Sequence, residues 1–409
     1  MNVTAAPQVH EPVVPEPAPG GLAQLVPAGL PACALVDLAA VAENVAVVRE
    51  RAGGAALMAV VKADGYGHGM VPVARAAVAA GAGWLGVAQL GEALELRAAG
   101  ITAPVLAWLT VPGDRFADAV AAGVDVGAGA GWVLEELAAA ARSTGRVARV
   151  QLKADTGLGR GGASPADWPG LVEHALRLQS DGVLALTGLF SHLACADAPG
   201  DPSVAAQLRG FTEAVAVAQA RGADPELVHL ANSAGVFGVP GSRFDAVRPG
   251  ISLYGLSPMP AVHTAAELGL RPAMSLVGRL ALVKDVPAGQ GISYGLTYRT
   301  PRATTLGLIP LGYGDGVPRS ASSAGPVLVA GRVRRVAGRV CMDQLVVDLD
   351  GDRPDAGDLA VLFGDGATGA PTAQDWAVAA ETISYEIVTR IGARVPRVYL
   401  PGPAGQEVR

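Results

Sequence analysis

The hydrophobic and polar positions of this chain change their pattern twice along its length. Residues 1–31 contain many prolines and show neither helical nor alternating periodicity, which predicts a disordered, Pro-rich tail. From residue 32 onward, short runs rich in Val, Ala and Leu alternate with amphipathic stretches of helical period, such as 71–80 and 91–99. This alternation predicts repeated strand–helix units.

Eight apolar runs with the length of strands follow the tail, each separated from the next by enough chain for a helix. They are 57–62, 84–88, 105–109, 124–127, 147–154, 186–192, 227–231 and 246–253. Eight such units favour an N-terminal (β/α)8 TIM-type barrel over residues 32–265. A doubly wound α/β sheet is the alternative fold, although it usually has fewer strands and a glycine-rich fingerprint after the first one.

The pattern changes again after residue 265. Alternating or β-rich runs at 276–286, 305–310, 326–336, 340–349 and 359–363 are separated by Gly, Pro and Asp turns. One amphipathic segment, 372–391, has a helical period. Residues 266–409 are therefore predicted to form a mostly β C-terminal domain with one helical segment near its end.

Composition and charge exclude several classes of protein. Half of the 409 residues are apolar, which is enough for large cores in about two domains. The net charge of −6, with no basic block longer than Arg334-Arg335, predicts no nucleic-acid partner. Three scattered cysteines without ligand spacing predict no metal site and a reducing compartment. Without a spanning apolar run or a signal-peptide pattern, we expect a cytoplasmic protein with no membrane partner.

Polar residues concentrate where the predicted barrel strands end, which is where barrel enzymes place their active sites. The first strand ends in Lys62, and an amine at the end of an apolar strand is desolvated, which favours Schiff-base chemistry. An isolated lysine there can also simply extend to the rim. Ser233 and the backbone N–H groups of Gly250 and Ile251 follow the last two strands, where barrels commonly bind phosphate. A Schiff-base lysine opposite a phosphate site predicts pyridoxal 5′-phosphate as the cofactor.

Eight motifs occur along the chain in the order VVKADGYGHG, LKADTGLGR, HLANSAG, VRPGISLYG, SYG, LGYGDGVPR, GRVCMDQ and SYEIVTR. In this order they resemble the motifs of bacterial alanine racemases, and the resemblance covers about residues 33–399. It implies a pyridoxal-phosphate-dependent isomerase that interconverts L-alanine and D-alanine by two-base proton transfer and supplies D-alanine for peptidoglycan. It also implies a homodimer with composite active sites.

The resemblance assigns roles to residues of the barrel. Lys62 would carry the cofactor as an internal aldimine and act as one of the two catalytic bases. Tyr66 would reach the cofactor phosphate, as would Tyr385 from the C-terminal domain. Arg248 would face the pyridine nitrogen, and because a guanidinium keeps its proton, it would donate a hydrogen bond and leave that nitrogen neutral. The other implied cofactor-binding residues are Arg160, His192, Asn232, Ser233, Gly250 and Ile251.

The remaining implied roles concern the second base and the substrate. Tyr294 would be the second base, entering from the partner subunit, because racemisation needs one base on each face of Cα. The implied substrate-binding residues are Arg160, Tyr313, Cys341 and Met342. Lys153 would be carbamylated, which converts a cation into an anion able to hold Arg160. An ordinary Lys153 paired with Asp155 or another acid is the alternative.

Three other functions fit the pattern less well. A non-catalytic barrel that only holds the cofactor would not need a second domain carrying Tyr294. A decarboxylase of the same plan would place an acid, rather than Arg248, at the pyridine nitrogen. A nicotinamide-dependent dehydrogenase would carry a glycine-rich fingerprint after the first strand. Serine and other small amino acids differ from alanine by contacts of only ~1–3 kcal/mol, so the pattern is compatible with several substrates.

Overall fold

The computed structural model describes residues 21–367 and 369–400. Most of the predicted tail, residues 1–20, lies outside this part of the chain. For residues 21–31 the prediction of disorder is wrong, because a short helix, α1 (Leu22–Leu25), leads into the buried Val26. Val26 packs with Cys33 and Val277 in a small apolar cluster, and this burial orders the segment.

A closed barrel of eight parallel strands forms the larger part of the molecule. Its strands are β2 (Ala56–Val60), β3 (Trp84–Val87), β4 (Val105–Ala107), β5 (Asp125–Ala128), β6 (Ala148–Lys153), β7 (Leu184–Phe190), β8 (Leu227–Asn232) and β9 (Ala246–Arg248). Pairing of β2 with β9 closes the barrel, so the doubly wound alternative is excluded and the predicted fold class is confirmed. The observed strands end within a few residues of the predicted ends, and at two of them the predicted strand runs into a turn: a turn begins at Lys62, and β9 ends at Arg248, before the 3₁₀ turn η2 (Ile251–Tyr254).

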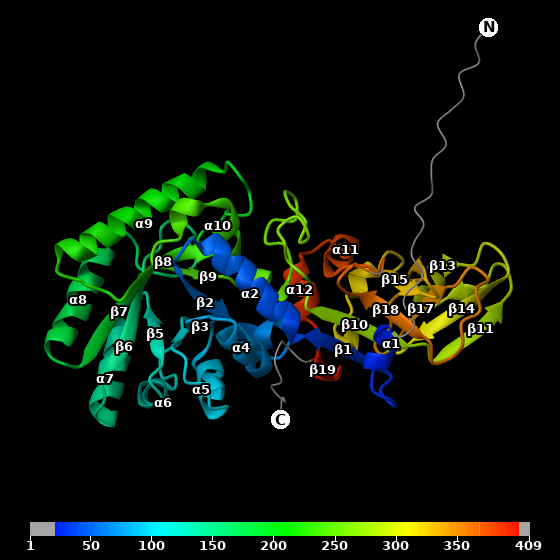
Figure 1. The fold of residues 1–409 in the computed structure, drawn as a ribbon, viewed down its shortest axis with the longest axis horizontal. Helices are drawn as coiled ribbons and strands as arrows, with labels where there is room; N and C mark the ends of the chain where they lie inside the picture. The colour runs from blue at the N-terminus through cyan, green and yellow to red at the C-terminus, as the bar shows by residue number, and fades with distance from the viewer. Residues whose placement is uncertain (1–20, 368, 401–409) are drawn as a thin grey trace, which may run out of the picture.

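Helices cover the outside of this barrel (Figure 1). They are α2 (Leu38–Ala52), α4 (Met70–Ala79), α5 (Leu90–Ala98), α6 (Phe116–Ala121), α7 (Gly131–Thr144), α8 (Trp168–Ser180), α9 (Pro202–Ala220) and α10 (Ser233–Gly238). Helix α2 shows how the local sequence sets the bounds. The Asp37 carboxylate accepts from the Ala40 N–H at 3.0 Å at its start, and Gly53 closes it in the left-handed conformation.

The second domain is mostly β, as predicted. Its strands are β10 (Met274–Arg279), β11 (Leu282–Val286), β12 (Gly291–Ile292), β13 (Tyr298–Arg299), β14 (Thr304–Ile309), β15 (Pro326–Val329), β16 (Arg332–Arg335), β17 (Leu345–Asp348), β18 (Leu359–Phe363) and β19 (Arg397–Leu400). The single predicted helix at 372–391 is instead two helices, α11 (Ala373–Ala379) and α12 (Ser384–Thr389). Likewise, the runs 276–286 and 326–336 each divide into two strands.

The first strand of the described chain, β1 (Ala32–Asp37), belongs to the second domain rather than to the barrel. It pairs antiparallel with β10 and parallel with β19, inside a sheet ordered β16-β15-β18-β10-β1-β19. The sequence boundary at residue 32 placed it in the barrel, because a buried apolar run does not reveal which sheet it joins. The described part of the chain therefore runs from β1 in the β domain through the barrel and back to the β domain, as Figure 1 shows.

The described residues include no helix that combines the length and the apolar character that a membrane span requires. They contain no group of three or more His, Cys, Asp or Glu side chains placed to hold a metal ion.

Candidate active site

A cavity of about 370 Å³ lies at the C-terminal ends of the barrel strands. It is lined by Val60, Lys62, Ala63, Tyr66, Trp108, Lys153, Arg160, Phe190, His192, Asn232, Ser233, Arg248, Gly250, Ile251, Tyr385 and Thr389. Four of these side chains are cations and none is a carboxylate. A cavity of this size and charge suits a small anionic ligand.

Lys62 enters the cavity from an unusual backbone turn. Immediately after it, Ala63, Asp64 and Gly65 have φ between 52° and 60° and ψ between 45° and 53°, and Tyr66 has φ 53°. This is a left-handed turn, which costs L-residues other than glycine roughly 1–2 kcal/mol each. Such strain persists only where surrounding contacts determine the conformation.

Three side chains supply those contacts. The Ala63 N–H donates to Glu92 Oε1 at 2.7 Å, and the Met70 N–H donates to Asp64 Oδ1 at 2.9 Å. His68 Nδ1 lies 2.9 Å from the Tyr66 carbonyl oxygen and 3.1 Å from that of Gly65, so it donates to both. The buried His68, Asp64 in the turn and Glu92 in α5 thus hold the backbone that carries Lys62 and Tyr66.

The two lysines of the cavity have lowered pKa values. Burial is the main cause for Lys62, and the charge of Arg160 lowers its pKa further while Glu92 raises it. Burial, Arg160 and Arg248 lower the pKa of Lys153 to about 8. Both amines can therefore lose their protons closer to neutral pH than an exposed lysine, which is the form that reacts with carbonyl carbon.

Small groups after β8 and β9 form one wall of the cavity. Ser233 Oγ accepts from the Gly250 N–H at 2.8 Å and from Ser252 Oγ at 3.1 Å. A Cβ at Gly250 would clash with the Tyr66 hydroxyl, so only glycine lets these loops approach so closely. The Tyr385 ring centroid lies 6.2 Å from that of Tyr66. Helix α12 brings Tyr385 here by packing against the Lys62 turn.

Arg248, at the end of β9, is a buried residue of the cavity lining. Its Nη2 donates to the carbonyl oxygens of Ser191 at 2.6 Å and Leu230 at 3.1 Å, and its Nη1 donates to the His229 carbonyl at 3.0 Å. Its Nη2 also lies 3.4 Å from His192 Nδ1. Burial lowers the pKa of Arg248 to about 9, and burial together with Arg248 lowers that of His192 to about 3. His192 is therefore neutral at pH 7.

The structure brings all ten predicted cofactor residues together, namely Lys62, Tyr66, Arg160, His192, Asn232, Ser233, Arg248, Gly250, Ile251 and Tyr385, with Lys153 beside them. It does not bring the second-domain residues Tyr294, Tyr313, Cys341 and Met342 to the same cavity. Three of them lie together elsewhere: the Tyr313 N–H donates to the Cys341 carbonyl, and the Gly314 N–H donates to that of Met342. Ser293, the residue before Tyr294, lies beside them, with its Oγ 3.3 Å from Cys341 Sγ. Tyr294 is 69% exposed.

Sequence reasoning missed several lining residues. Trp108 and Phe190 follow or end barrel strands, so the strand-end rule could have found them. Thr389 carries no such signal, because it reaches the cavity only through the packing of α12. His229, which contacts Arg248 with Nδ1 at 2.7 Å, sits inside an apolar strand and reads as a core residue in the sequence.

Fold and site together define a two-domain barrel enzyme with a lysine at the cavity mouth. The family model "Alanine racemase, N-terminal domain" matches residues 36–258, and "Alanine racemase, C-terminal domain" matches residues 273–399. This chain belongs to the alanine racemase family, whose members are isomerases.

Several relatives support this placement at high identity. An alanine racemase of Streptomyces coelicolor is 61% identical over 376 residues, which are 91% of this chain and 96% of that protein. The structure of alanine racemase from D-cycloserine producing Streptomyces lavendulae matches with a TM-score of 0.91 and 56% identity, covering 92% of this chain and 98% of the other. The Bacillus anthracis enzyme, with bound L-Ala-P, matches at a TM-score of 0.82 and 35% identity, covering 92% and 96%.

Proposed function

We propose that this protein is a pyridoxal-phosphate-dependent racemase that interconverts L-alanine and D-alanine by two-base proton transfer. The observation that carries the proposal is the cavity with four cations and no carboxylate, whose lining combines Lys62 with the wall formed by Ser233 and Gly250. The residues fit a phosphate-bearing aldehyde, because they offer a reactive amine, hydroxyl and backbone donors, and positive charge. The family relationship supports the same cofactor and substrate.

Different residues of this protein would bind the phosphate and the aldehyde of that cofactor. Ser233, the backbone N–H groups of Gly250 and Ile251, and the hydroxyls of Tyr66 and Tyr385 would bind the phosphate. Lys62 Nζ would bind the aldehyde carbon. When bound, pyridoxal phosphate supplies an electron-withdrawing ring that stabilises negative charge at Cα of the amino acid.

Arg248 would donate a hydrogen bond to the ring nitrogen of the cofactor. Whether the guanidinium keeps its proton then determines whether that nitrogen is protonated. Its Nη1 and Nη2 groups already bind carbonyl oxygens and His229, whereas its Nε–H has no hydrogen-bond partner among the described residues. A guanidinium keeps its proton, so it can donate to the ring nitrogen without protonating it. By leaving that nitrogen unprotonated, Arg248 would weaken electron withdrawal from Cα and so favour return of the proton to Cα.

Two bases on opposite faces of Cα would exchange the proton, namely Lys62 Nζ and the Tyr294 hydroxyl. Tyr294 lies outside the cavity of its own chain and is 69% exposed, which supports its entry into the cavity of a second copy. Tyr313, Cys341 and Met342 cluster near it and would contact the substrate across the same interface, with Arg160 on the other side. The protein would then be a homodimer with an isologous interface and two equivalent sites.

Subunit complementation tests this composite site. We expect Lys62→Ala and Tyr294→Phe proteins to be almost inactive alone, whereas an equal mixture that exchanges subunits should recover roughly a quarter of wild-type activity. Random pairing makes half of the dimers mixed, and one of the two sites in each mixed dimer has both bases intact. Each variant mixed with itself is the control. A mixture that stays inactive while mass spectrometry shows exchange would place both bases on one chain.

The proposed reaction itself is tested by borohydride trapping combined with an assay on both enantiomers of alanine. We expect the trapped cofactor on the peptide that contains Lys62, and interconversion of L- and D-alanine at equal equilibrium amounts. Trapping at Lys62 without any turnover would favour the non-catalytic barrel. Release of CO2 from the amino acid would favour the decarboxylase.

We further propose that Lys153 is carbamylated. Its pKa of about 8 leaves a fraction of neutral amine at pH 7, and only a neutral amine adds to CO2. No carboxylate of the described residues forms a salt bridge with it, and Asp155 instead accepts from the N–H groups of Gly157 and Gly159. A carbamate here would give Arg160 a negative partner. Native mass spectrometry with ¹³C-labelled bicarbonate detects the added CO2.

A glycine substitution tests the phosphate-binding wall. Gly250→Ala should weaken cofactor binding by about tenfold to a hundredfold, because the new Cβ clashes with the Tyr66 hydroxyl and displaces it. Fluorescence titration of cofactor-free protein measures the change. Gly170→Ala is the matched control, since Gly170 lies in α8 with open space around its Cα. Unchanged affinity in Gly250→Ala would contradict the assignment of this wall.

We propose that the enzyme acts in the cytoplasm and supplies D-alanine for peptidoglycan. Alanine is the proposed substrate, which is consistent with the L-Ala-P bound to the Bacillus anthracis relative.

A further inference from the structure

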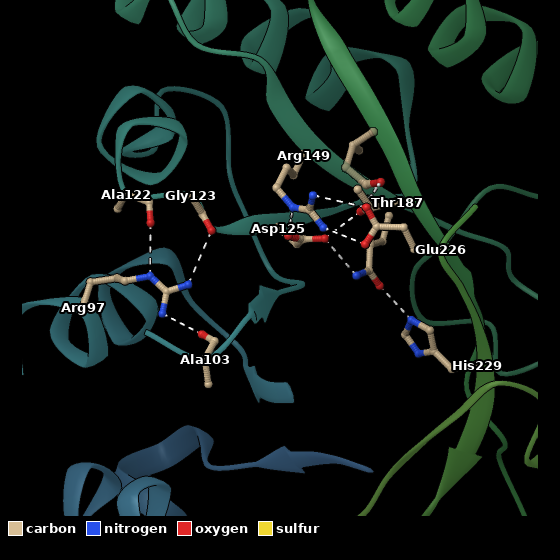
Figure 2. A network of polar contacts seen from close by, with 11 residues as sticks. Arg97, Ala103, Ala122, Gly123, Asp125, Arg149, Thr187, Glu226 and His229 are labelled. Atoms are coloured by element: carbon tan, nitrogen blue, oxygen red, sulfur yellow. Dashed lines mark hydrogen bonds and ion pairs between the residues drawn. The ribbon is translucent and has the colours of Figure 1, made fainter. Parts of the chain in front are cut away.

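A network of hydrogen-bonded, buried polar side chains crosses the interior of the barrel and ends at Arg248. Figure 2 shows the part from Arg149 to His229, in which Arg149, Thr187 and Asp125 lie together and His229 lies beyond them. Asp125 is 1% exposed and comes from β5, Gln151 from β6 and His229 from β8 are fully buried, and Thr187 from β7 is 1% exposed. None of these residues lines the cavity.

Asp125 determines which groups donate and which accept in this network. Asp125 Oδ1 forms an ion pair with Arg149 Nε at 2.7 Å, and Arg149 also pairs with Glu226 at 2.9 Å. Asp125 Oδ2 accepts from Thr187 Oγ at 2.6 Å and from Gln151 Nε2 at 3.1 Å. An ionised carboxylate can only accept, so the Gln151 amide must turn its NH2 group toward Asp125.

This orientation determines the tautomer of His229. With its NH2 group at Asp125, Gln151 presents Oε1 to His229 Nε2 at 2.7 Å, and a carbonyl oxygen can only accept. Nε2 must therefore carry the ring proton. Burial and Arg248 lower the pKa of His229 well below its ordinary value, so the ring is neutral and Nδ1 is a lone-pair acceptor. Nδ1 lies 2.7 Å from Arg248 Nη1, which donates to it.

We propose that Asp125 and Gln151 are positioning residues that hold His229 as the Nε2–H tautomer, so that its Nδ1 orients the Arg248 guanidinium toward the cofactor ring. The inference deepens the proposed function and rests on it. The opposite tautomer would place the Nδ1–H of His229 against an N–H of Arg248, which would push the guanidinium out of position.

The arrangement has a clear electrostatic use. No carboxylate of the described residues pairs with Arg248, whose neighbours are carbonyl oxygens and a neutral imidazole. The Phe190 and His229 rings stack with their centroids 5.2 Å apart and their planes 3° apart, which limits tilting of the imidazole. Arg248 is thus oriented without a carboxylate in direct contact, and its charge remains available to the cavity.

The first experiment reads the tautomer directly in the cofactor-loaded wild-type protein. Nitrogen NMR of the ¹⁵N-histidine-labelled enzyme, with His229 assigned from a His229→Gln spectrum, should show a protonated Nε2 and an unprotonated Nδ1 from pH 6 to pH 9. A protonated Nδ1 would overturn the proposal. This measurement needs no activity, so its failure is distinguishable from failure of the proposed racemase function, which the alanine assay reports.

The second experiment interrupts this hydrogen-bond network at Gln151. Gln151→Met removes the link to Asp125 with little change in volume, and we expect a second His229 signal with a protonated Nδ1. We also expect kcat to fall about tenfold to a hundredfold while KM changes less than about threefold, because orientation rather than binding is lost. The ratio of transamination to racemisation should rise. A single unchanged tautomer together with unchanged kcat would overturn the proposal.

Thr187→Val is the matched control. It removes another hydrogen bond to the same oxygen of Asp125, in the same buried region and at nearly the same volume, but it leaves the Gln151–His229 link intact. We expect the Nε2–H tautomer to persist in this variant even if its melting temperature falls. Loss of the tautomer in Thr187→Val as well would show that general packing sets it, and would overturn the role of Gln151.

Discussion

Lys62→Ala is expected to lose covalent cofactor attachment completely and racemase activity by at least ~10³-fold. In the proposed reaction Lys62 would supply both the amine that binds the cofactor aldehyde and the base for one face of Cα, and one positioned proton-transfer group alone contributes about 10²–10⁴-fold. Its amine is suited to both roles because burial and Arg160 lower its pKa. Visible absorbance, borohydride-trapped peptide mapping and D-alanine formation measure the three losses.

The matched control for this prediction is Lys153→Ala, which removes the other lysine of the same cavity. Lys153 ends β6, and its pKa is also lowered, so lysine burial alone does not distinguish the two. We expect Lys153→Ala to retain the covalent cofactor. Trapped cofactor on the Lys62→Ala protein, or its loss from the Lys153→Ala protein, would mean that Lys153 is the attachment site.

The second large effect is expected for Arg248→Glu. Replacing a fixed donor in a dry site raises the barrier by about 3–4 kcal/mol, equivalent to roughly 10²–10³-fold in turnover. A carboxylic acid can protonate the ring nitrogen, which makes the ring a stronger electron sink. We therefore expect a larger share of reaction events to end in transamination, measured as pyruvate formed per racemisation event.

Arg248→Lys separates charge from geometry in this prediction. A lysine keeps the positive charge but cannot reproduce the bonds to Ser191, His229 and Leu230, because it lacks the planar fork of donors. We expect reduced turnover without the increase in transamination. Unchanged turnover in Arg248→Glu, in a protein with normal circular dichroism, would show that this residue does not face the reacting ring.

Periodicity was sufficient to predict the barrel and the β domain. The strand-like runs fell within a few residues of the eight barrel strands, and the strand-end rule located Lys62, Ser233, Gly250 and Ile251 in one cavity. These predictions succeed because the side-chain period and the parallel strand direction are properties of the local chain. The motifs also predicted that Tyr385 belongs to this cavity. The periodicity of the sequence does not place Tyr385 near Lys62.

Other features depend on contacts between segments that are distant in the sequence. The run 32–37 could have joined either sheet, and its pairing with β10 and β19 was decided only when both were present. The left-handed turn after Lys62 requires Glu92 and His68 to hold a backbone that alanine and aspartate disfavour.

The sequence by itself determined the alternation of strands and helices, the cationic strand ends and the motifs that identify the family. Only the tertiary structure decided that Tyr294 lies outside its own cavity, and that Asp125 and Gln151 connect to Arg248 through His229. The physical reason is the range of the interactions: propensity and periodicity act within one element, whereas the direction of a buried hydrogen bond depends on which donors and acceptors four different strands bring together.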